Sequence, residues 1–161
     1  MESATRLFSE SEGKLLTIKL GNQEYGIPIL EAREVVKMMA IEPIPQTPAF
    51  MRGVLNLRGH IHPVIDLRTK FSMEPKEDTP ETCIILVNLV GQATGMVADQ
   101  LIGVTTLEPS SFEENPDLGH HINNRFLLGI AKLEERVILV LNLDEVLNND
   151  ELLAISESIT A

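Results

Sequence analysis

Histidine offers the first candidate chemistry in this sequence, because the neutral imidazole ring is a common ligand of zinc. His60 and His62 stand two residues apart in a run with strand character, so both side chains should point to one face of a strand. His120 and His121 form a second pair in a polar segment. A zinc site needs a third or fourth ligand, and none occurs at a characteristic spacing. We therefore interpret His60 and His62 as exposed or interface-facing side chains, with a metal-dependent hydrolase built on both pairs as the alternative.

Other catalytic groups lack the neighbours that their chemistry requires. The only cysteine, Cys83, lies in an apolar run, which disfavours the thiolate that a nucleophile needs. Carboxylate pairs such as Glu113–Glu114 and Glu134–Glu135 lie in polar segments, whereas a general acid needs an apolar pocket. No G-x-S-x-G elbow and no phosphate-binding glycine motif is present. We expect a protein that is not an enzyme and that binds no cofactor and no metal.

Charge is distributed unevenly along the chain. The net charge is −11, of which residues 1–80 contribute −1 and residues 81–161 contribute −10, while residues 33–76 carry +3. This pattern is read either as a solvated surface or as two faces that attract different partners. Nucleic acid is not expected as a partner, because the acidic half repels phosphate and few aromatic residues are available for base stacking.

The location is predicted from cysteine and hydropathy. A single cysteine forms no intrachain disulfide, which favours a reducing compartment. The polar segment Met1–Gly13 lacks the apolar stretch of a signal peptide. The longest uncharged run, Thr82–Ala98, falls short of the roughly 20 apolar residues of a membrane helix. We expect a cytoplasmic protein without direct membrane insertion.

The chain contains an internal repeat. The segment 50–67, FMRGVLNLRGHIHPVIDL, matches the segment 126–143, FLLGIAKLEERVILVLNL, without a gap. The matches include Phe50 with Phe126, Gly53 with Gly129 and a series of aliphatic positions. Upstream, Leu15–Ile29 and Cys83–Val97 each read as strand, turn and strand, at a slightly smaller offset. The repeat indicates that one supersecondary unit occurs twice.

Short aliphatic runs between turn residues are typical of small sandwiches and barrels. The predicted strands of the first half are Leu15–Leu20, Gln23–Ile29, Val35–Met38, Val54–Asn56 and His60–Leu67. Those of the second half are Ile84–Val90, Thr94–Ala98, Leu101–Leu107, Leu127–Ile130 and Val137–Asn142. Because a closed sheet has no exposed edge, we expect an all-β fold, mostly β with minor helices, that consists of two β-barrels in tandem.

The predicted boundaries follow the repeat. A flexible N-terminus covers residues 1–12, barrel 1 residues 13–71, a linker residues 72–80, barrel 2 residues 81–142 and a C-terminal amphipathic helix residues 143–157. The linker SMEPKEDTP is rich in charge and proline. Residues 109–124 are predicted to form a polar loop.

The two copies of the repeat differ most at one turn. Asn56-Leu57-Arg58-Gly59 in the first copy corresponds to Lys132-Leu133-Glu134-Glu135 in the second. Gly59 permits a positive φ angle, and the tight turn that follows would direct Arg58 outward. An exposed arginine is well suited to a protein interface, and a solvated turn with an incidental arginine is the alternative.

The segment GVLNLRGHIHPVIDLRTKF, Gly53–Phe71, resembles the signature of CheW-like coupling proteins of bacterial chemotaxis. LGNQEYGIPILEAREVV at Leu20–Val36 and VILVLNLDEVLNNDELL at Val137–Leu153 extend the similarity to about residues 13–157. The resemblance implies one CheW-like domain of two interlocked, five-stranded, SH3-like barrels. His62, Pro28 and the pair Met38-Met39 depart from the usual pattern of the family.

The resemblance also implies a scaffold that bridges the cytoplasmic tips of chemoreceptors to the regulatory domain of a CheA-type histidine kinase. Carried over residue by residue, receptor contact falls on Glu34, Val35, Val36, Asn56, Leu57, Arg58 and Gly59. Kinase contact falls on the second barrel around Gly103–Leu107 and includes Gly103, Val104 and Thr105. An adaptor of a chemotaxis-like pathway with another output, such as pili, is the alternative within this class.

Overall fold

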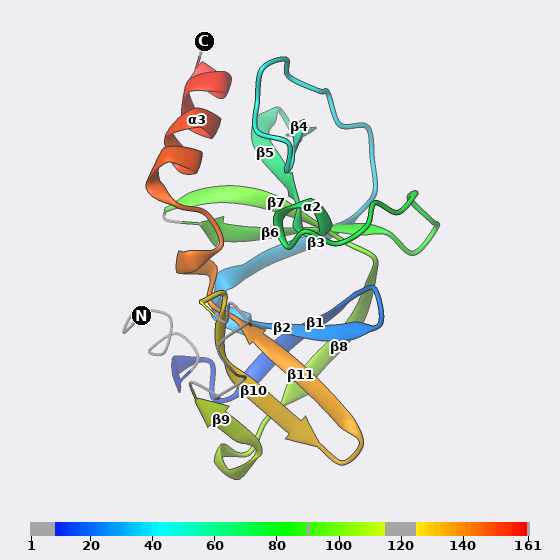
Figure 1. The fold of residues 1–161 in the computed structure, drawn as a ribbon, viewed down its shortest axis with the longest axis vertical. Helices are drawn as coiled ribbons and strands as arrows, with labels where there is room; N and C mark the ends of the chain where they lie inside the picture. The colour runs from blue at the N-terminus through cyan, green and yellow to red at the C-terminus, as the bar shows by residue number, and fades with distance from the viewer. Residues whose placement is uncertain (1–8, 90, 115–124, 161) are drawn as a thin grey trace. The chain divides into compact units, whose positions relative to one another are not determined.

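The computed structural model describes residues 9–89, 91–114 and 125–160. The fold is mostly β, as predicted (Figure 1). Its strands are β1 (Lys14–Leu20), β2 (Gln23–Pro28), β3 (Ala32–Lys37), β4 (Met51–Leu57), β5 (His60–Asp66), β6 (Cys83–Leu89), β7 (Gln92–Ala98), β8 (Gln100–Thr106), β9 (Phe112–Glu114), β10 (Leu127–Leu133) and β11 (Arg136–Leu141). Its helices are the 3-10 turns η1 (Ile29–Glu31), η2 (Pro109–Ser111) and η3 (Leu143–Glu145), and the α-helices α2 (Leu67–Lys70) and α3 (Asn149–Thr160).

The described strands form two sheets. One has six strands in the order β8-β1-β2-β11-β10-β9, and the other has five in the order β3-β6-β7-β5-β4. The chain accordingly divides into two compact units. Unit 1 comprises Met1–Ala32 and Leu101–Val146, and unit 2 comprises Arg33–Gln100 and Leu147–Ala161. Two β units are therefore present, but the sheet of unit 1 has one strand more than the predicted five.

The predicted boundaries of two consecutive barrels are wrong, because the sheets exchange hairpins between the copies of the repeat. In unit 1, β2 lies beside β11 (Figure 1) and pairs with it in parallel, which places Gly26 opposite Val140. In unit 2, β5 pairs in parallel with β7, which places Val64 opposite Gly95. Each sheet thus joins a hairpin of the first copy to a hairpin of the second.

The predicted linker is also misplaced. The chain passes between the units after Ala32, Gln100 and Val146, whereas residues 72–80 lie wholly within unit 2. This segment has no regular structure, and two arginines of unit 2 hold it. Arg68 donates to the carbonyl oxygen of Glu74 over 2.9 Å, and Arg52 pairs with Asp78 over 3.0 Å. Residues 72–80 are therefore an anchored loop of one unit.

The register of the two matched hairpins confirms the repeat. Gly53 lies opposite Val64 in β4–β5, and its match Gly129 lies opposite Val140, the match of Val64, in β10–β11. Each first strand has a register shift immediately before its glycine, between Met51 and Gly53 and between Leu127 and Gly129. The same β-bulge is thus built twice.

Gly53 and Gly129 allow a neighbouring chain segment to approach closely. A Cβ atom on Gly53 would collide with the carbonyl oxygen of Glu42, and one on Gly129 would collide with that of Glu113. Glu42 forms an isolated bridge with Val54, whereas Glu113 belongs to β9. Residues 109–124, predicted to be a polar loop, thus begin with regular structure, since residues 109–114 form η2 and β9. Residues 115–124 lie outside the described residues.

Aliphatic residues form the two cores, and some of them, such as Val64 and Val140, occupy equivalent positions of the repeat. The core cluster of unit 1 contains Leu15, Leu107, Leu128, Ala131, Ile138 and Val140. That of unit 2 contains Leu55, Leu57, Val64, Ile84, Leu86 and Val97. Strand β4 alternates between buried and less buried residues, because side chains of a strand point to opposite faces in turn, whereas β6 is buried at nearly every position.

The ends of the chain differ from the prediction. Ser11 is buried, and its hydroxyl accepts a hydrogen bond from the backbone nitrogen of Leu30, so a fully flexible segment 1–12 is wrong for its described part. Helix α3 begins only at Asn149, after the 3-10 turn η3. A reciprocal capping box explains this start, because Asn148 and Glu151 each accept a hydrogen bond from the other's backbone nitrogen over 2.8 Å. Among the described residues, no helix has the length and apolar character to cross a membrane.

Candidate functional site

The turn between β4 and β5 directs one arginine into solvent. Leu57 and His60 close a two-residue loop in which Arg58 and Gly59 both have positive φ angles, 52° and 84°. Positive φ at both central residues suits the right-handed twist of a hairpin. Asn56 accepts a hydrogen bond from the backbone nitrogen of Gly59 over 3.1 Å, and Leu57 is buried in the core of unit 2. Asn56 and Gly59 thus stabilise the turn, Leu57 anchors it in the core, and the guanidinium of Arg58 is exposed at its tip.

Arg58 is held in place by Glu34 of β3. Its two terminal nitrogens donate to the two carboxylate oxygens of Glu34 over 3.0 and 2.5 Å, a bidentate pair. These hydrogen bonds lower the pKa of Glu34 and raise that of Arg58. The Arg58 side chain remains 66% exposed, so it can contact a partner while Glu34 orients it.

A cavity of about 260 Å³ lies beside this pair within unit 2. Leu57, Leu86 and Ala93 supply its apolar lining, and Arg33, His60 and His62 supply positive or ionisable groups. The rings of His60 and His62 lie 6.5 Å apart. Among the described residues, no third His, Cys, Asp or Glu joins them in a group that could hold a metal ion. His120 and His121 lie outside the described residues.

The corresponding turn of unit 1 has a different chemistry. Glu134 and Glu135 occupy the loop between β10 and β11, and both are exposed. Glu134 has a positive φ of 51°, as Arg58 does. Lys132 stands where Asn56 stands in the first copy, and it lies 3.8 Å from Glu113 of β9. The second copy thus presents carboxylates where the first presents a guanidinium.

The remaining predicted residues lie on equivalent edge strands. Glu34, Val35 and Val36 belong to β3, which is an edge of the five-stranded sheet. Gly103, Val104 and Thr105 belong to β8, which is an edge of the six-stranded sheet. The offset along the chain between these two sets is the same as the offset between β1–β2 and β6–β7. The predicted contact residues therefore occupy the same position in the two units.

Strand β8 has an exposed apolar surface. Val104 is 60% exposed and Ile102 is 41% exposed. Gly103 is fixed by Thr17 of β1, whose hydroxyl donates to its carbonyl oxygen over 3.0 Å. An edge strand offers unpaired backbone groups beside such side chains, which is a common basis of protein contact.

Sequence reasoning missed several neighbours of these surfaces. Arg136 pairs with Glu24 over 2.7 Å and contacts the hydroxyl of Thr105 over 3.4 Å, which ties β11 to β8 within unit 1. Ile61 and Val137, matched in the repeat, are 48% and 45% exposed. Their exposure could have been predicted, because both follow a polar turn on the face opposite to the core.

Comparisons with known proteins agree with this architecture. The family model for the CheW-like domain matches residues 14–151. A protein named chemotaxis protein CheW from Klebsiella aerogenes is 31% identical over 153 residues, which cover 94% of this chain and 92% of that protein. Protein FrzA of Myxococcus xanthus is 28% identical over 138 residues, covering 84% and 86%. The crystal structure of scaffolding protein TtCheW from Thermoanaerobacter tengcongensis has a TM-score of 0.79 at 33% identity, covering 87% of this chain and 95% of that chain.

Proposed function

Because this chain belongs to the CheW-like family, we propose that it is a non-catalytic adaptor that couples chemoreceptors to a CheA-type histidine kinase in the cytoplasm. Relatives are named as chemotaxis proteins, and a solved relative is named as a scaffolding protein. The two equivalent surfaces of unlike chemistry support this role, because a coupling protein must bind two partners.

The receptor surface in this proposal is centred on Arg58, and that exposed guanidinium is the observation that carries the assignment. Glu34 fixes its direction, while Asn56 and Gly59 fix the turn. Val35 and Val36 of β3 are half-buried next to Glu34, and Leu57 lines the cavity beside Arg58. An oriented arginine beside aliphatic groups is a frequent anchor of protein interfaces, because its side chain loses little further freedom on binding.

The kinase surface in this proposal is the edge strand β8, represented by Gly103, Val104 and Thr105. The exposure of Val104 and Ile102 supplies apolar area, and the edge supplies backbone hydrogen bonds. The contact of Arg136 with Thr105 adds a polar border. Apolar contact at one surface and an arginine at the other would let each partner discriminate between them.

Binding of purified partners tests the assignment. Arg58→Glu should weaken binding of a chemoreceptor signalling fragment at least about tenfold, because it replaces the anchor and repels Glu34. Lys132→Glu is the matched control, since it makes the same charge change at the turn of the other unit and should leave receptor binding unchanged. Val104→Glu should weaken binding of the kinase regulatory domain and spare the receptor.

Circular dichroism and urea unfolding would establish that each variant is folded. A folded Arg58→Glu protein that binds the receptor fragment normally contradicts the receptor assignment. A folded Val104→Glu protein with normal kinase binding contradicts the kinase assignment.

A further inference from the structure

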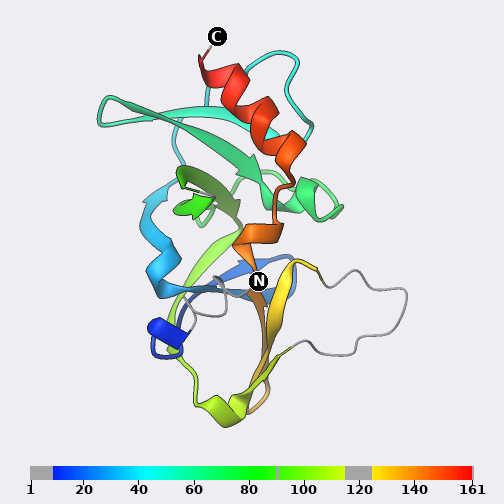
Figure 2. The same ribbon diagram turned by 90° about the vertical axis from the view of Figure 1, so that its left-hand side faces the viewer.

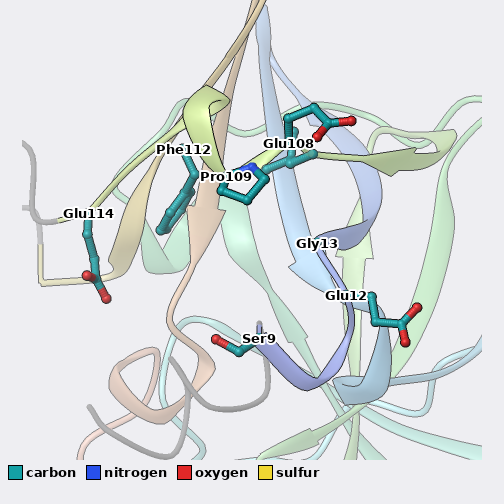
Figure 3. A pocket seen from close by; sticks show the side chains of 8 residues that line it. Ser9, Glu12, Gly13, Glu108, Pro109, Phe112 and Glu114 are labelled. Atoms are coloured by element: carbon teal, nitrogen blue, oxygen red, sulfur yellow. The ribbon is translucent and has the colours of Figure 1, made fainter.

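A second and larger cavity, of about 510 Å³, lies in unit 1, next to the end of the range assigned above to kinase contact (Figure 3). It is bordered by the turn before β1, by the segment that follows β8 and by β9. Its volume falls within the roughly 300–1,000 Å³ of known ligand pockets. The cavity is therefore large enough for several side chains of a partner.

The floor of this cavity is apolar and fixed. Leu107 is buried in the core of unit 1, and Phe112 packs against the same core. The backbone nitrogen of Leu107 donates to the carbonyl oxygen of Gly13 over 2.8 Å, which ties the wall of the cavity to the sheet. A Cβ atom on Gly13 would lie only 2.5 Å from the carbonyl oxygen of Leu107, so the two backbones are in close contact. A floor of this kind needs little reorganisation on binding.

The rim of the cavity is acidic. Glu12, Glu108 and Glu114 border it and are all exposed. In Figure 3 the Phe112 ring stands between Glu114 on one side and Glu108 and Glu12 on the other. Within the described part of the chain, no lysine or arginine forms an ion pair with these three residues. A site with carboxylates on both sides of an apolar floor is complementary to a ligand in which basic groups flank an apolar group.

The equivalent positions of unit 2 lack two of these three charges. At the offset that relates β3 to β8, Glu108 corresponds to Met39. Glu42 bridges to Val54 and Glu113 pairs with its match Ile130, so Pro43, the residue after Glu42, is the equivalent of Glu114. The two units therefore differ at two of the three rim positions: Glu108 and Glu114 lie in the half of the chain that contributes −10 to the net charge, whereas Glu12 lies in the other half and corresponds to Glu81.

We propose that this cavity is a docking site for a short basic segment of a partner protein, in which an aromatic or aliphatic side chain sits on Phe112 and Leu107 between two lysines or arginines. The apolar side chain is desolvated on the floor, and the flanking cations face the carboxylates of the rim. The site adjoins the kinase surface at Leu107 but contains none of Gly103, Val104 and Thr105, and it does not depend on the proposed function.

Titration of the ¹⁵N-labelled full chain with a model peptide tests this proposal. The probe is acetyl-Lys-Phe-Lys-Leu-Lys-amide, in salt near 0.15 M so that long-range attraction is screened. We expect amide shifts at Gly13, Leu107 and Phe112. The double variant Glu108→Lys, Glu114→Lys should weaken binding at least about tenfold. Glu134→Lys, Glu135→Lys makes the same charge change on the same unit and should alter affinity less than about twofold.

Several results overturn the proposal. They are shifts confined to residues outside the cavity, equal binding of acetyl-Glu-Phe-Glu-Leu-Glu-amide, equal binding of acetyl-Lys-Ser-Lys-Ser-Lys-amide, and no binding by the full chain. If the full chain fails to bind while the variant Arg6→Ser, Leu7→Ser, Phe8→Ser binds, the occupant is the chain's own N-terminal segment, which has the same basic and apolar chemistry. Self-association of the chain that the peptide disrupts would instead identify a second copy as the occupant and would also overturn the assignment to a different partner.

Discussion

The hairpins β4–β5 and β10–β11 have the same register and the same bulge, yet their turns carry opposite charges. Arg58 is displayed in unit 2 and is paired with Glu34, whereas Glu134 and Glu135 are displayed in unit 1. The backbone of the turn does not require either charge, since Arg58 and Glu134 have nearly the same positive φ, 52° and 51°. The two copies therefore share one backbone scaffold, while the charges that their turns present are opposite.

The interiors of the two hairpins differ as well. Ile138 of β11 is fully buried in the core of unit 1, and His62 of β5 takes its place in the first copy. His62 lines the cavity beside Arg58 instead of filling the core. A polar residue at a core position thus coincides with the surface that we assign to the receptor, which is typical of positions where function overrides packing.

The capping residues at the ends of β5 and β11 show the same divergence. Asp66 accepts hydrogen bonds from the backbone nitrogens of Arg68 and Thr69, which starts α2 directly after β5 (Figure 2). Asn142, its equivalent after β11, is buried, and its side-chain oxygen has no hydrogen-bond partner among the described residues. The side chain of Asp66 thus caps α2, whereas that of Asn142 caps no backbone nitrogen and only the 3-10 turn η3 follows it.

The largest effect should come from separating the two copies. Fragments 1–75 and 76–161 should each lack cooperative unfolding, because the parallel pairs β2–β11 and β5–β7 need strands from both fragments. Mixing the fragments should restore the sheets, as measured by far-ultraviolet circular dichroism and thermal unfolding. The intact chain is the control. A cooperative transition in either fragment alone would support two consecutive barrels and contradict the exchange.

The next effect concerns the matched glycines. Gly53→Ala should lower the free energy of unfolding by about 3 kcal/mol, because its φ is +143° and its Cβ would meet the backbone of Glu42. Gly129→Ala should cost about 2 kcal/mol, because the short edge strand β9 can move. Gly91→Ala, at φ +80° with open space around it, is the control and should cost about 1 kcal/mol. Equal losses in urea unfolding of all three would show that close approach has no role.

A smaller effect is expected in the pH dependence of stability, to which only one of the two equivalent positions contributes. Burial raises the pKa of Glu31 to about 7, and the negative charge of Asp144 adds to the rise. At the offset that relates β3 to β8, Glu31 of unit 1 corresponds to the neutral Gln100. Because the folded pKa lies above the ordinary value, the fold disfavours the charged form, and stability should fall as the pH rises toward about 7 and then level off.

Glu31→Gln should therefore raise the free energy of unfolding by about 2 kcal/mol near pH 8 and change it little near pH 4.5. Asp144→Asn should shift the pH dependence to lower values, since it removes the smaller cause of the raised pKa. Urea unfolding across this range measures both. A variant Glu31→Gln with the same pH dependence as the original protein would show that another group is responsible.

Local pattern was sufficient to predict the strands, the repeat and the turn at Arg58. Alternation of apolar residues and the turn residues Asn56 and Gly59 act within a few positions of the chain, so they can be read from the sequence. The exchange of hairpins could not be read in this way, because parallel pairing joins β2 to β11 across most of the chain. The three-residue strand β9 was not predicted, because it forms only by pairing with β10, where the missing side chain of Gly129 lets the backbone of Glu113 approach.

The candidate site was predicted unevenly. The exposure of Arg58 followed from the turn, and the remaining contact residues came from resemblance to the family. The bidentate pair with Glu34 depends on β3 and the β4–β5 turn meeting in space, and no local pattern encodes that. The sequence offset between the two strand–turn–strand segments also relates Glu34–Val36 to Gly103–Thr105. That both sets lie on edge strands depends on the sheet topology, which the offset does not encode.

Exchanging the charges of Glu34 and Arg58 is the sharpest test of the receptor assignment. The double variant Glu34→Arg, Arg58→Glu keeps an ion pair at this turn, so its urea unfolding midpoint should stay close to that of the original protein. We predict that binding of the receptor fragment, measured by isothermal titration calorimetry, falls at least about tenfold while kinase binding is unchanged. Normal receptor binding by the exchanged pair would show that Arg58 and Glu34 only hold the turn together, and it would contradict the account.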